Sequence, residues 1–293
     1  MQSFVCLYGF PAAGKTTFAR HFLQEHKDFV GIGADAVRQT LYGSEDHYGD
    51  SKEIYAELVR QMTDALRDGK SVLYDGTNLR RQDRLDFLFD LPSIPIHREV
   101  IKLPTNMEVC AERHLQRDRD IPLEKILPYF SIGEEPEKKE GWDQISTCCT
   151  RAYIASPFFE DAHRAAAVKA AEILRSRGID TYLPLEHKVP NAWDLPNHEW
   201  GAAVYRADVK AIRNSDTVVV LSYGRLGSAG TAWEAGYAFG IGKRVIVVEM
   251  PGTTLMSLMV ANGRTATVKG LDGLQNYDFI RFPELRDNEM EQK

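Results

Sequence analysis

Residues 9–17 read GFPAAGKTT, which fits the pattern G-x-x-x-x-G-K-[ST]. The apolar run from Ser3 to Tyr8 before this segment predicts a strand, and a helical pattern begins at Lys15. A glycine-rich turn between a strand and a helix directs backbone N–H groups inward, and the helix adds its positive end. The segment therefore predicts a loop that holds the phosphates of a nucleotide, within an α/β fold.

The residues of this loop have separate expected roles in holding ATP and Mg²⁺. The Lys15 ammonium is expected to reach the β- and γ-phosphates, and the Thr16 hydroxyl is expected to ligate Mg²⁺. Asp75, which ends a strand-like run beginning at Ser71, is expected to hold Mg²⁺ through water. The residues expected to contact the nucleotide are Gly9, Ala12, Ala13, Gly14, Lys15, Thr16 and Thr17.

Two further groups of charged residues are candidates for the chemistry of phosphoryl transfer. Asp35 and Arg38 follow the strand-like run 29–33, and Asp35 is expected to accept a proton from an attacking hydroxyl. Arg113 and Arg117 lie four residues apart on one helix face, from which they are expected to close over the phosphates. A helix cap with a solvated charge, and a surface ion-pair helix, are the competing interpretations.

The alternation of strand-like and helical runs is interrupted once. At 293 residues the chain is long enough for two domains, and the charged segment 134–140 precedes a new strand-like run at 151–156. We therefore expect domains at 1–147 and 148–293, each a three-layer α/β unit with a parallel sheet. Later strands are predicted at 180–183, 217–222 and 244–249, and helices at 161–177, 198–214 and 229–239.

Composition narrows the class of protein. There are 36 Lys and Arg against 42 Asp and Glu, a net charge of −6, with 27% charged and 43% hydrophobic residues. This balance is typical of a globular protein and argues against one that coats nucleic acid by bulk charge. No apolar stretch approaches the ~18 residues of a membrane helix, and no signal-peptide pattern is present, so we expect a cytoplasmic protein without a membrane partner.

The C-terminal half places a carboxylate beside a small-residue turn. Residues 228–231, Ser-Ala-Gly-Thr, open a helix whose first N–H groups can hold an anion, and Glu234 follows one turn later. Asp208 and Asp216 flank a helix end and the next strand start, so two or three carboxylates are expected to converge at the carboxyl edge of the sheet. The alternative is that Glu234 is only a carboxylate favoured by the helix dipole.

The segment 1–145 resembles the 5′-hydroxyl polynucleotide kinase family of P-loop kinases. The motifs that carry the resemblance are GFPAAGKTT, Asp35-x-x-Arg38, DGTNL at 75–79 followed by Arg84, and Arg113-x-x-x-Arg117 ahead of Ile121-Pro122. The resemblance implies that Asp35 is the general base, that Arg38 contacts a substrate phosphate, and that the two later arginines are lid residues near ATP. Nucleosides, sugars, modified bases and nucleic-acid 5′ ends all remain candidate substrates.

The segment 151–280 resembles the nucleoside 2-deoxyribosyltransferase superfamily. The matching motifs are YIASPFF at 153–159, Asp208, GTxxExGY at 230–237 and Gly242-Lys243. The resemblance implies a Rossmann-like, flavodoxin-like fold in which Glu234 attacks the anomeric carbon, Tyr153 orients Glu234, and Asp208 handles the proton of the departing base. Two such carboxyl groups suit cleavage of an N-glycosidic bond through a covalent glycosyl-enzyme intermediate. Ser156 and Gly230 are expected to contact the substrate.

One residue departs from the transferase pattern. Transferases usually have an aspartate six residues before the nucleophile, where this chain has Ser228, and Ser228 resembles the 2′-deoxynucleoside 5′-monophosphate N-hydrolase branch. Ser257 falls where that branch has a phosphate-contacting serine, in a region that reaches the neighbouring subunit, so a homo-oligomer is implied. A carboxylate would repel a phosphate, whereas a hydroxyl donates to it. Ser228 as a helix cap is compatible with either branch.

These expectations combine into one hypothesis with two alternatives. The hypothesis is a two-domain enzyme in which an ATP- and Mg²⁺-dependent 5′-hydroxyl kinase is joined to an N-glycosidase that cleaves (deoxy)nucleoside 5′-monophosphates. The first alternative is a true nucleoside 2-deoxyribosyltransferase with an independent kinase. The second is an ATP-gated nucleotide sensor, which the candidate nucleophile disfavours because a binding module does not need one.

Overall fold

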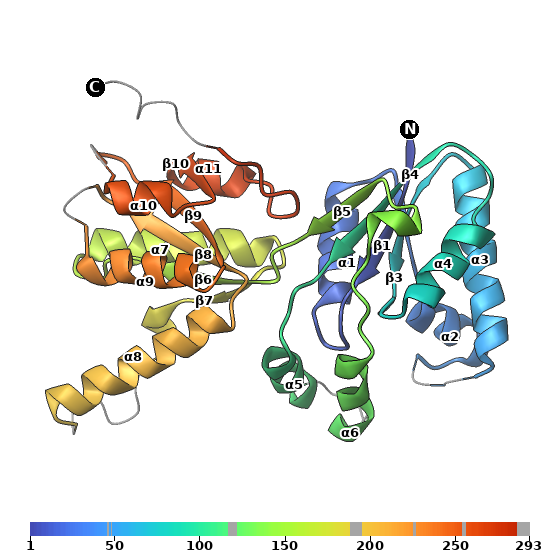
Figure 1. Ribbon diagram of the computed structural model, residues 1–293, viewed down its shortest axis with the longest axis horizontal. Coiled ribbons are helices and arrows are strands. Elements are labelled where there is room, and N and C mark those ends of the chain that lie inside the picture. The colour runs from blue at the N-terminus through green and yellow to red at the C-terminus, as the bar shows by residue number, and fades with distance from the viewer. Residues whose placement is uncertain are drawn as a thin grey trace. The chain divides into compact units, whose positions relative to one another are not determined.

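The computed structural model of the chain describes residues 1–45, 47, 49–116, 122–187, 195–224, 227–253 and 256–285. Contacts between residues divide it into two compact units, Met1–Cys148 and Cys149–Lys293. Each unit has its own five-stranded sheet flanked by helices (Figure 1). The two neighbouring cysteines at the division, Cys148 and Cys149, are buried.

In the first unit all neighbouring strands pair in parallel, in the order β2-β3-β1-β4-β5. The strands are β1 (Gln2–Tyr8), β2 (Phe29–Gly33), β3 (Ser71–Asp75), β4 (Ile96–Lys102) and β5 (Gln144–Thr147). The helices are α1 (Lys15–Glu25), α2 (Ala34–Tyr42), α3 (Ser51–Arg67), α4 (Arg81–Asp90), α5 (Met107–Leu115) and α6 (Leu123–Ile126), with 3₁₀ turns at Leu127–Ser131 and Lys138–Glu140. Five consecutive residues of β1 are buried, as expected for a central strand covered on both faces.

A buried ion pair holds the loop after β3. The guanidinium of Arg84, which is fully buried, donates from Nε and Nη2 to the two carboxylate oxygens of Glu140, at 2.9 and 2.7 Å. Its Nη1 donates to the carbonyl of Asn78 at 2.9 Å, and the Asn78 amide donates to the carbonyl of Leu7 at 2.7 Å. Arg84 therefore links the β3 loop to the end of β1, where the glycine-rich loop starts.

The Glu140 carboxylate of this pair accepts hydrogen bonds from two side chains. Trp142 Nε1 donates to Glu140 at 2.9 Å, in addition to the two bonds from Arg84. Burial by itself raises the pKa of Glu140, but the hydrogen bonds from Arg84 and Trp142 outweigh it and hold the pKa below its ordinary value. Glu140 consequently stays ionised at neutral pH.

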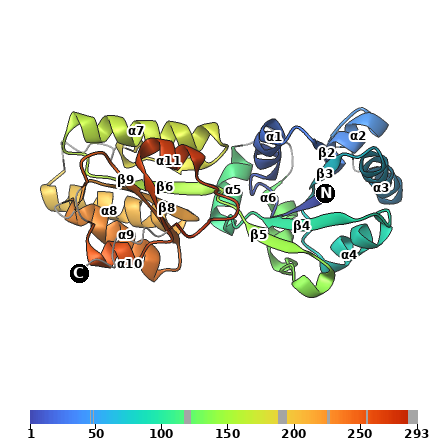
Figure 2. The same ribbon diagram turned by 90° about the horizontal axis from the view of Figure 1, so that it is seen from above.

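In the second unit the parallel strands follow the order β10-β9-β8-β6-β7. The strands are β6 (Arg151–Ala155), β7 (Asp180–Tyr182), β8 (Thr217–Ser222), β9 (Arg244–Glu249) and β10 (Ala266–Lys269). The helices are α7 (Asp161–Ser176), α8 (Asn197–Arg213), α9 (Ala229–Gly240), α10 (Leu258–Asn262) and α11 (Gly270–Asn276), with a 3₁₀ turn at Pro184–Glu186. Helices α7 and α11 cover one face of the sheet, and α8, α9 and α10 cover the other (Figure 2).

The expected α/β class with parallel sheets is confirmed in both units. In the second unit the chain moves from β6 outward to β7 and then returns to the other side of β6 for β8. The strand order therefore reverses between β6 and β8. Loops that leave the carboxyl ends of two such strands diverge and create a crevice, which is where open α/β sheets bind ligands.

The Arg84–Glu140 pair predicts a stability difference between single and double substitution. Arg84→Met alone leaves the buried Glu140 carboxylate without its cationic partner and should lower the free energy of unfolding by about 3–5 kcal/mol. Arg84→Met combined with Glu140→Leu removes both charges and should lose clearly less. Urea unfolding followed by tryptophan fluorescence measures both, in a background where Trp193, Trp200 and Trp233 are replaced by phenylalanine so that Trp142 alone reports. A double variant as unstable as Arg84→Met would contradict the pairing argument.

Candidate active sites

The glycine-rich loop joins β1 to α1 in a strained conformation. Ala12 and Gly14 have φ values of 62° and 100°, in the left-handed region that turns the chain back on itself. Lys15 is 8% exposed, and its ammonium donates to the carbonyls of Gly9 and Phe10, at 3.0 and 2.8 Å. No side chain caps the start of α1, so the N–H groups that a cap would satisfy remain for a ligand. This is the geometry of an anion-binding loop.

A second helix supports the loop from outside. The hydroxyl of Thr105, just before α5, donates to the carbonyl of Ala13 at 2.9 Å, and Arg113 Nη1 on α5 donates to the same oxygen at 3.1 Å. Arg113 therefore lies against the loop that it was expected to serve. The expected partner of Arg113, Arg117, lies outside the described residues.

Two candidate carboxylates lie at the ends of neighbouring strands. Asp75 is the last residue of β3 and pairs in register with Gly33, which ends β2. Asp35 follows in the first turn of α2, and Arg38 donates from Nη2 to Asp35 Oδ1. Since parallel strands end at one edge of the sheet, Asp35 and Asp75 share that edge with the glycine-rich loop.

The donors at this edge suit a magnesium ion bound mainly by phosphate and water. Thr16 and Asp75 offer the hard oxygen ligands that Mg²⁺ prefers, and Mg²⁺ in phosphate sites usually takes only one or two ligands from the protein. In the described ranges, no group of three or more His, Cys, Asp or Glu side chains is arranged to hold a metal ion. Thr16 and Asp75 therefore fit a nucleotide-bound ion.

The second unit brings Tyr153 and Glu234 together from positions 81 residues apart. Tyr153, on β6, is fully buried, and its hydroxyl donates to Glu234 Oε1 on α9 at 2.5 Å. Tyr182 on β7 pairs in register with Tyr153 and stacks on its ring at a centroid distance of 5.6 Å. His187 stacks in turn on Tyr182 at 4.0 Å. The phenol that contacts Glu234 is thus held at one end of a column of three rings.

Asp208, on α8, completes a pair of carboxyl groups with perturbed acidity. Burial raises the pKa of Glu234, the hydrogen bond from Tyr153 lowers it and the nearby Asp208 raises it, and the net result is a pKa of about 7. Burial raises the pKa of Asp208 to about 6. Tyr153 lowers the pKa of both carboxyl groups, and its one hydroxyl hydrogen is donated to Glu234. Such a pair can supply one nucleophile and one acid.

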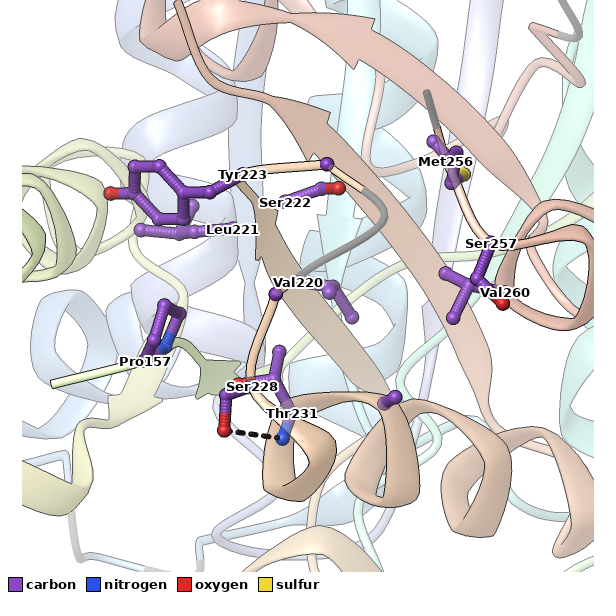
Figure 3. A pocket seen from close by; sticks show the side chains of 13 residues that line it. Pro157, Val220, Leu221, Ser222, Tyr223, Ser228, Thr231, Met256, Ser257 and Val260 are labelled. Atoms are coloured by element: carbon purple, nitrogen blue, oxygen red, sulfur yellow. Dashed lines mark hydrogen bonds between the residues drawn. The ribbon is translucent and has the colours of Figure 1, made fainter. Parts of the chain in front are cut away.

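A small cavity lies at the carboxyl edge where the strand order reverses (Figure 3). Its wall includes Ser228 and Ser257, the two serines that sequence reasoning proposed as phosphate contacts. The remaining described lining residues are Pro157, Val220, Leu221, Ser222, Tyr223, Gly224, Gly227, Thr231, Ala232, Met256 and Val260. Ser228 caps α9, since its hydroxyl oxygen accepts from the N–H of Thr231 at 3.4 Å.

The other expected site residues have different positions. Ser156 is buried just after β6 and donates to the carbonyl of Pro157 at 3.2 Å, while Gly230 lies in the first turn of α9. The expectation that Asp216 joins the carboxylates is wrong. Asp216 precedes β8, so it lies at the opposite edge, where it accepts from the backbone N–H groups of Thr150 and Arg151 at 2.6 and 2.9 Å.

Sequence reasoning missed three residues of this site. Tyr182 and His187 contribute to the ring column, but nothing in their spacing signals that β7 pairs with β6. Thr231 lines the cavity, and here a signal existed, because it lies three residues after Ser228 and three before Glu234. Residues three apart share one face of a helix.

Comparison with protein families agrees with both halves of this description. Residues 152–278 match the family described as nucleoside 2-deoxyribosyltransferase, and residues 4–127 match the family described as AAA domain. Each match covers less than half of the chain. The class of protein is therefore a kinase-like P-loop domain followed by a nucleoside 2-deoxyribosyltransferase-like domain, as the two resemblances indicated.

Individual relatives resemble one part of the chain at a time. The protein named transcription factor bHLH140 from Arabidopsis thaliana is 32% identical over 164 residues, which are 52% of this chain and 16% of that protein. This chain thus corresponds to only 16% of the length of that curated relative.

Three similar solved structures each cover half of this chain or less. A 2-deoxyribosyltransferase from Bacillus psychrosaccharolyticus is 28% identical, covering 46% of this chain and 98% of its own, with a TM-score of 0.43. A sugar kinase from Janibacter is 20% identical, covering 50% and 86%, with a TM-score of 0.39. A fungal RNA kinase is 13% identical, covering 50% and 38%, with a TM-score of 0.38.

Because the pKa of Glu234 is raised in the folded protein, replacing Glu234 with an uncharged residue is expected to increase the stability of the protein, and the increase should depend on pH. Unfolding returns Glu234 from a pKa of about 7 to its ordinary 4.5, so ionisation of the folded protein costs stability as pH rises through this interval. Glu234→Gln keeps an oxygen for Tyr153 and removes that cost. It should raise stability at pH 8 by up to roughly 3 kcal/mol and change it little at pH 4. Thermal unfolding at both pH values measures this, and an equal effect at both would refute it.

Proposed function

We propose that this protein is a bifunctional enzyme of nucleotide metabolism. Its first unit is an ATP- and Mg²⁺-dependent 5′-hydroxyl kinase, and its second unit is an N-glycosidase that cleaves (deoxy)nucleoside 5′-monophosphates. The observation that carries the proposal is the buried hydrogen bond from Tyr153 to Glu234, because Glu234 lies on α9, the helix whose first turn lines a cavity with Ser228 and Thr231. A nucleophile and a hydroxyl-bearing cavity wall on one helix suit a nucleoside 5′-monophosphate.

The glycosidase step assigns the two carboxyl groups different protonation states. The Glu234 carboxylate attacks the anomeric carbon while the bond from that carbon to the base nitrogen breaks, and protonated Asp208 gives its proton to the departing base. Water then attacks the anomeric carbon as the bond to Glu234 breaks, and the proton that water loses returns to Asp208, which restores both carboxyl groups. In the ligand-free protein the pKa of Glu234, about 7, lies above that of Asp208, about 6, so this assignment rests on the hydrogen bond that Tyr153 donates to Glu234.

The arrangement around Ser228 favours a monophosphate over a free nucleoside. Ser228 uses an oxygen lone pair to cap the N–H of Thr231, so its own hydroxyl hydrogen is directed elsewhere and is available to a phosphate oxygen. Capping and phosphate binding are therefore compatible roles of one side chain. An aspartate here would cap equally well but would have no hydrogen to donate and would repel the anion.

The kinase proposal rests on the first unit. When bound, Mg²⁺-ATP supplies the phosphoryl group. Lys15 would neutralise the phosphates, Thr16 and Asp75 would hold the ion, and Asp35 would accept the proton of the attacking hydroxyl. Arg38 holds Asp35 through their ion pair and would contact the substrate phosphate. When such a kinase acts on a nucleoside, its product is a nucleoside 5′-monophosphate, the class of compound whose N-glycosidic bond the second unit is proposed to cleave.

Two further proposals concern the whole protein. We expect a homo-oligomer formed through the second unit, because Leu258 and Met259, beside Ser257, are 61% and 84% exposed. Sedimentation velocity tests this. We also propose a cytoplasmic location; no helix in the described residues is long and apolar enough to cross a membrane.

The first test separates the two activities. Lys15→Ala removes the cation at the phosphates and should lower ATP-dependent phosphorylation by roughly 10²-fold or more, while cleavage of a preformed 5′-monophosphate stays within about twofold of wild type. Chromatography of products, with and without ATP, measures both. If the folded variant lost cleavage as well, the result would contradict the hypothesis of two independent sites and favour the hypothesis that ATP binding gates the second unit.

The second test separates hydrolase from transferase. Ser228→Asp should lower use of a deoxynucleoside 5′-monophosphate by roughly 1–3 kcal/mol, ~5- to 150-fold, relative to the nucleoside. Ser228→Thr keeps a capping hydroxyl and is the matched control. The measurement is the ratio of kcat/KM for the two substrates. A wild-type ratio below one that Ser228→Asp leaves unchanged would favour the transferase.

A further inference from the structure

Thr231 has a buried hydroxyl that makes no hydrogen bond. The residue is 6% exposed, in the first turn of the twelve-residue helix α9, and its Oγ1 has no partner within the described part of the chain. Its backbone N–H is occupied by the Ser228 cap, so only the side chain is unsatisfied. Thr231 also lines the cavity beside Ser228 (Figure 3).

An unsatisfied buried hydroxyl destabilises a fold and needs a reason. Most buried polar groups in proteins have a partner, and valine would fill nearly the same space without a polar atom. Packing alone therefore gives no advantage to threonine at this position. A hydroxyl that faces a cavity gains its partner when a ligand enters.

The cavity suits a small anionic group. Its volume is about 60 Å³, which is room for a group of a few heavy atoms, since roughly 10–15 Å³ of such space holds one water. The start of α9 directs partial positive charge toward the cavity, and Ser228, Thr231 and Ser257 bring hydroxyl groups to its wall. A tetrahedral phosphate matches this size, charge and donor set.

Helix geometry relates this cavity to the nucleophile. Ser228, Thr231 and Glu234 follow one another at three-residue intervals, so Thr231 lies within about 60° of each of the other two around α9. A rise of 1.5 Å per residue separates Ser228 from Glu234 by about 9 Å along the helix. A pentose bridges such an interval, with its anomeric carbon at Glu234 and its 5′-phosphate at the cavity.

We propose that Thr231 is a specificity-determining residue whose hydroxyl donates to a phosphoryl oxygen of a 5′-monophosphate ester in this cavity. The proposal deepens the glycosidase function proposed above and rests on it for the identity of the substrate. The phosphate contact itself is separable, because it can be measured with inorganic phosphate alone.

The experiment compares Thr231→Val with Thr231→Ser in the full-length chain. Thr231→Val removes the hydroxyl at nearly constant volume, and Thr231→Ser retains it. Calorimetric titration with inorganic phosphate and with a deoxynucleoside 5′-monophosphate gives affinities. The ratio of kcat/KM for the monophosphate to that for the nucleoside gives specificity, and thermal unfolding without ligand gives stability. Phosphorylation by the first unit serves as a control for folding and concentration.

Thr231→Val should weaken both ligands by about 10- to 100-fold and lower the specificity ratio by a similar factor. It should also raise the unfolding midpoint of the ligand-free protein by about 2–4 °C, because an unsatisfied polar atom is gone. Thr231→Ser should restore affinity and the ratio to within about threefold of wild type. A residue needed only for packing would not combine higher stability with weaker binding.

Three results would overturn the proposal. Unchanged phosphate affinity in Thr231→Val would remove the contact. A lower unfolding midpoint for Thr231→Val would show that the hydroxyl already has a partner in the protein. Equal losses for monophosphate and nucleoside would move the contact to the sugar. If wild type cleaves neither substrate yet loses phosphate affinity on Thr231→Val, the glycosidase fails and the phosphate contact stands.

Discussion

The common direction of the strands is the constraint on which both units depend. In a parallel sheet every strand ends at the same edge, so side chains far apart in the chain meet there when they follow the right strands. The glycine-rich loop after β1, Asp35 after β2 and Asp75 at the end of β3 share one such edge. Ser156 and Ser228 follow β6 and β8 at the other sheet, where the strand order reverses.

Buried polar groups are treated in two contrasting ways. Arg84 and Glu140 are completely paired, and their bonds hold the loop after β3, in which the carbonyl of Thr77 accepts from the N–H of Gly9 at 3.2 Å. Glu234, Asp208 and Thr231 are buried with incomplete compensation: two carboxyl groups with raised pKa values and one unpartnered hydroxyl. Burying such groups lowers the stability of the fold. We expect that a bound ligand supplies the hydrogen bonds and charges that these groups lack in the protein alone.

Local patterns predicted the features whose residues are neighbours in the chain. The strand, the turn and the helix around Lys15 are consecutive, so the residues themselves indicated their geometry. The alternation of elements likewise predicted the α/β class, which the structure confirms. Contacts over long separations were not available in this way: the Arg84–Glu140 pair spans 56 residues and the Tyr153–Glu234 bond spans 81. Only a resemblance to known families linked Tyr153 to Glu234.

The sequence by itself determined a phosphate-binding loop, two α/β units and a helix that opens at Ser228, because each depends on periodicity and turn chemistry within a few residues. Tertiary structure decided which carboxylates meet. It placed Asp216 at the wrong edge of the sheet for catalysis and brought Asp208 into the surroundings of Glu234 and Tyr153. It also left the hydroxyl of Thr231 without a partner beside a cavity. Burial and strand order are properties of the packed chain, which no local pattern encodes.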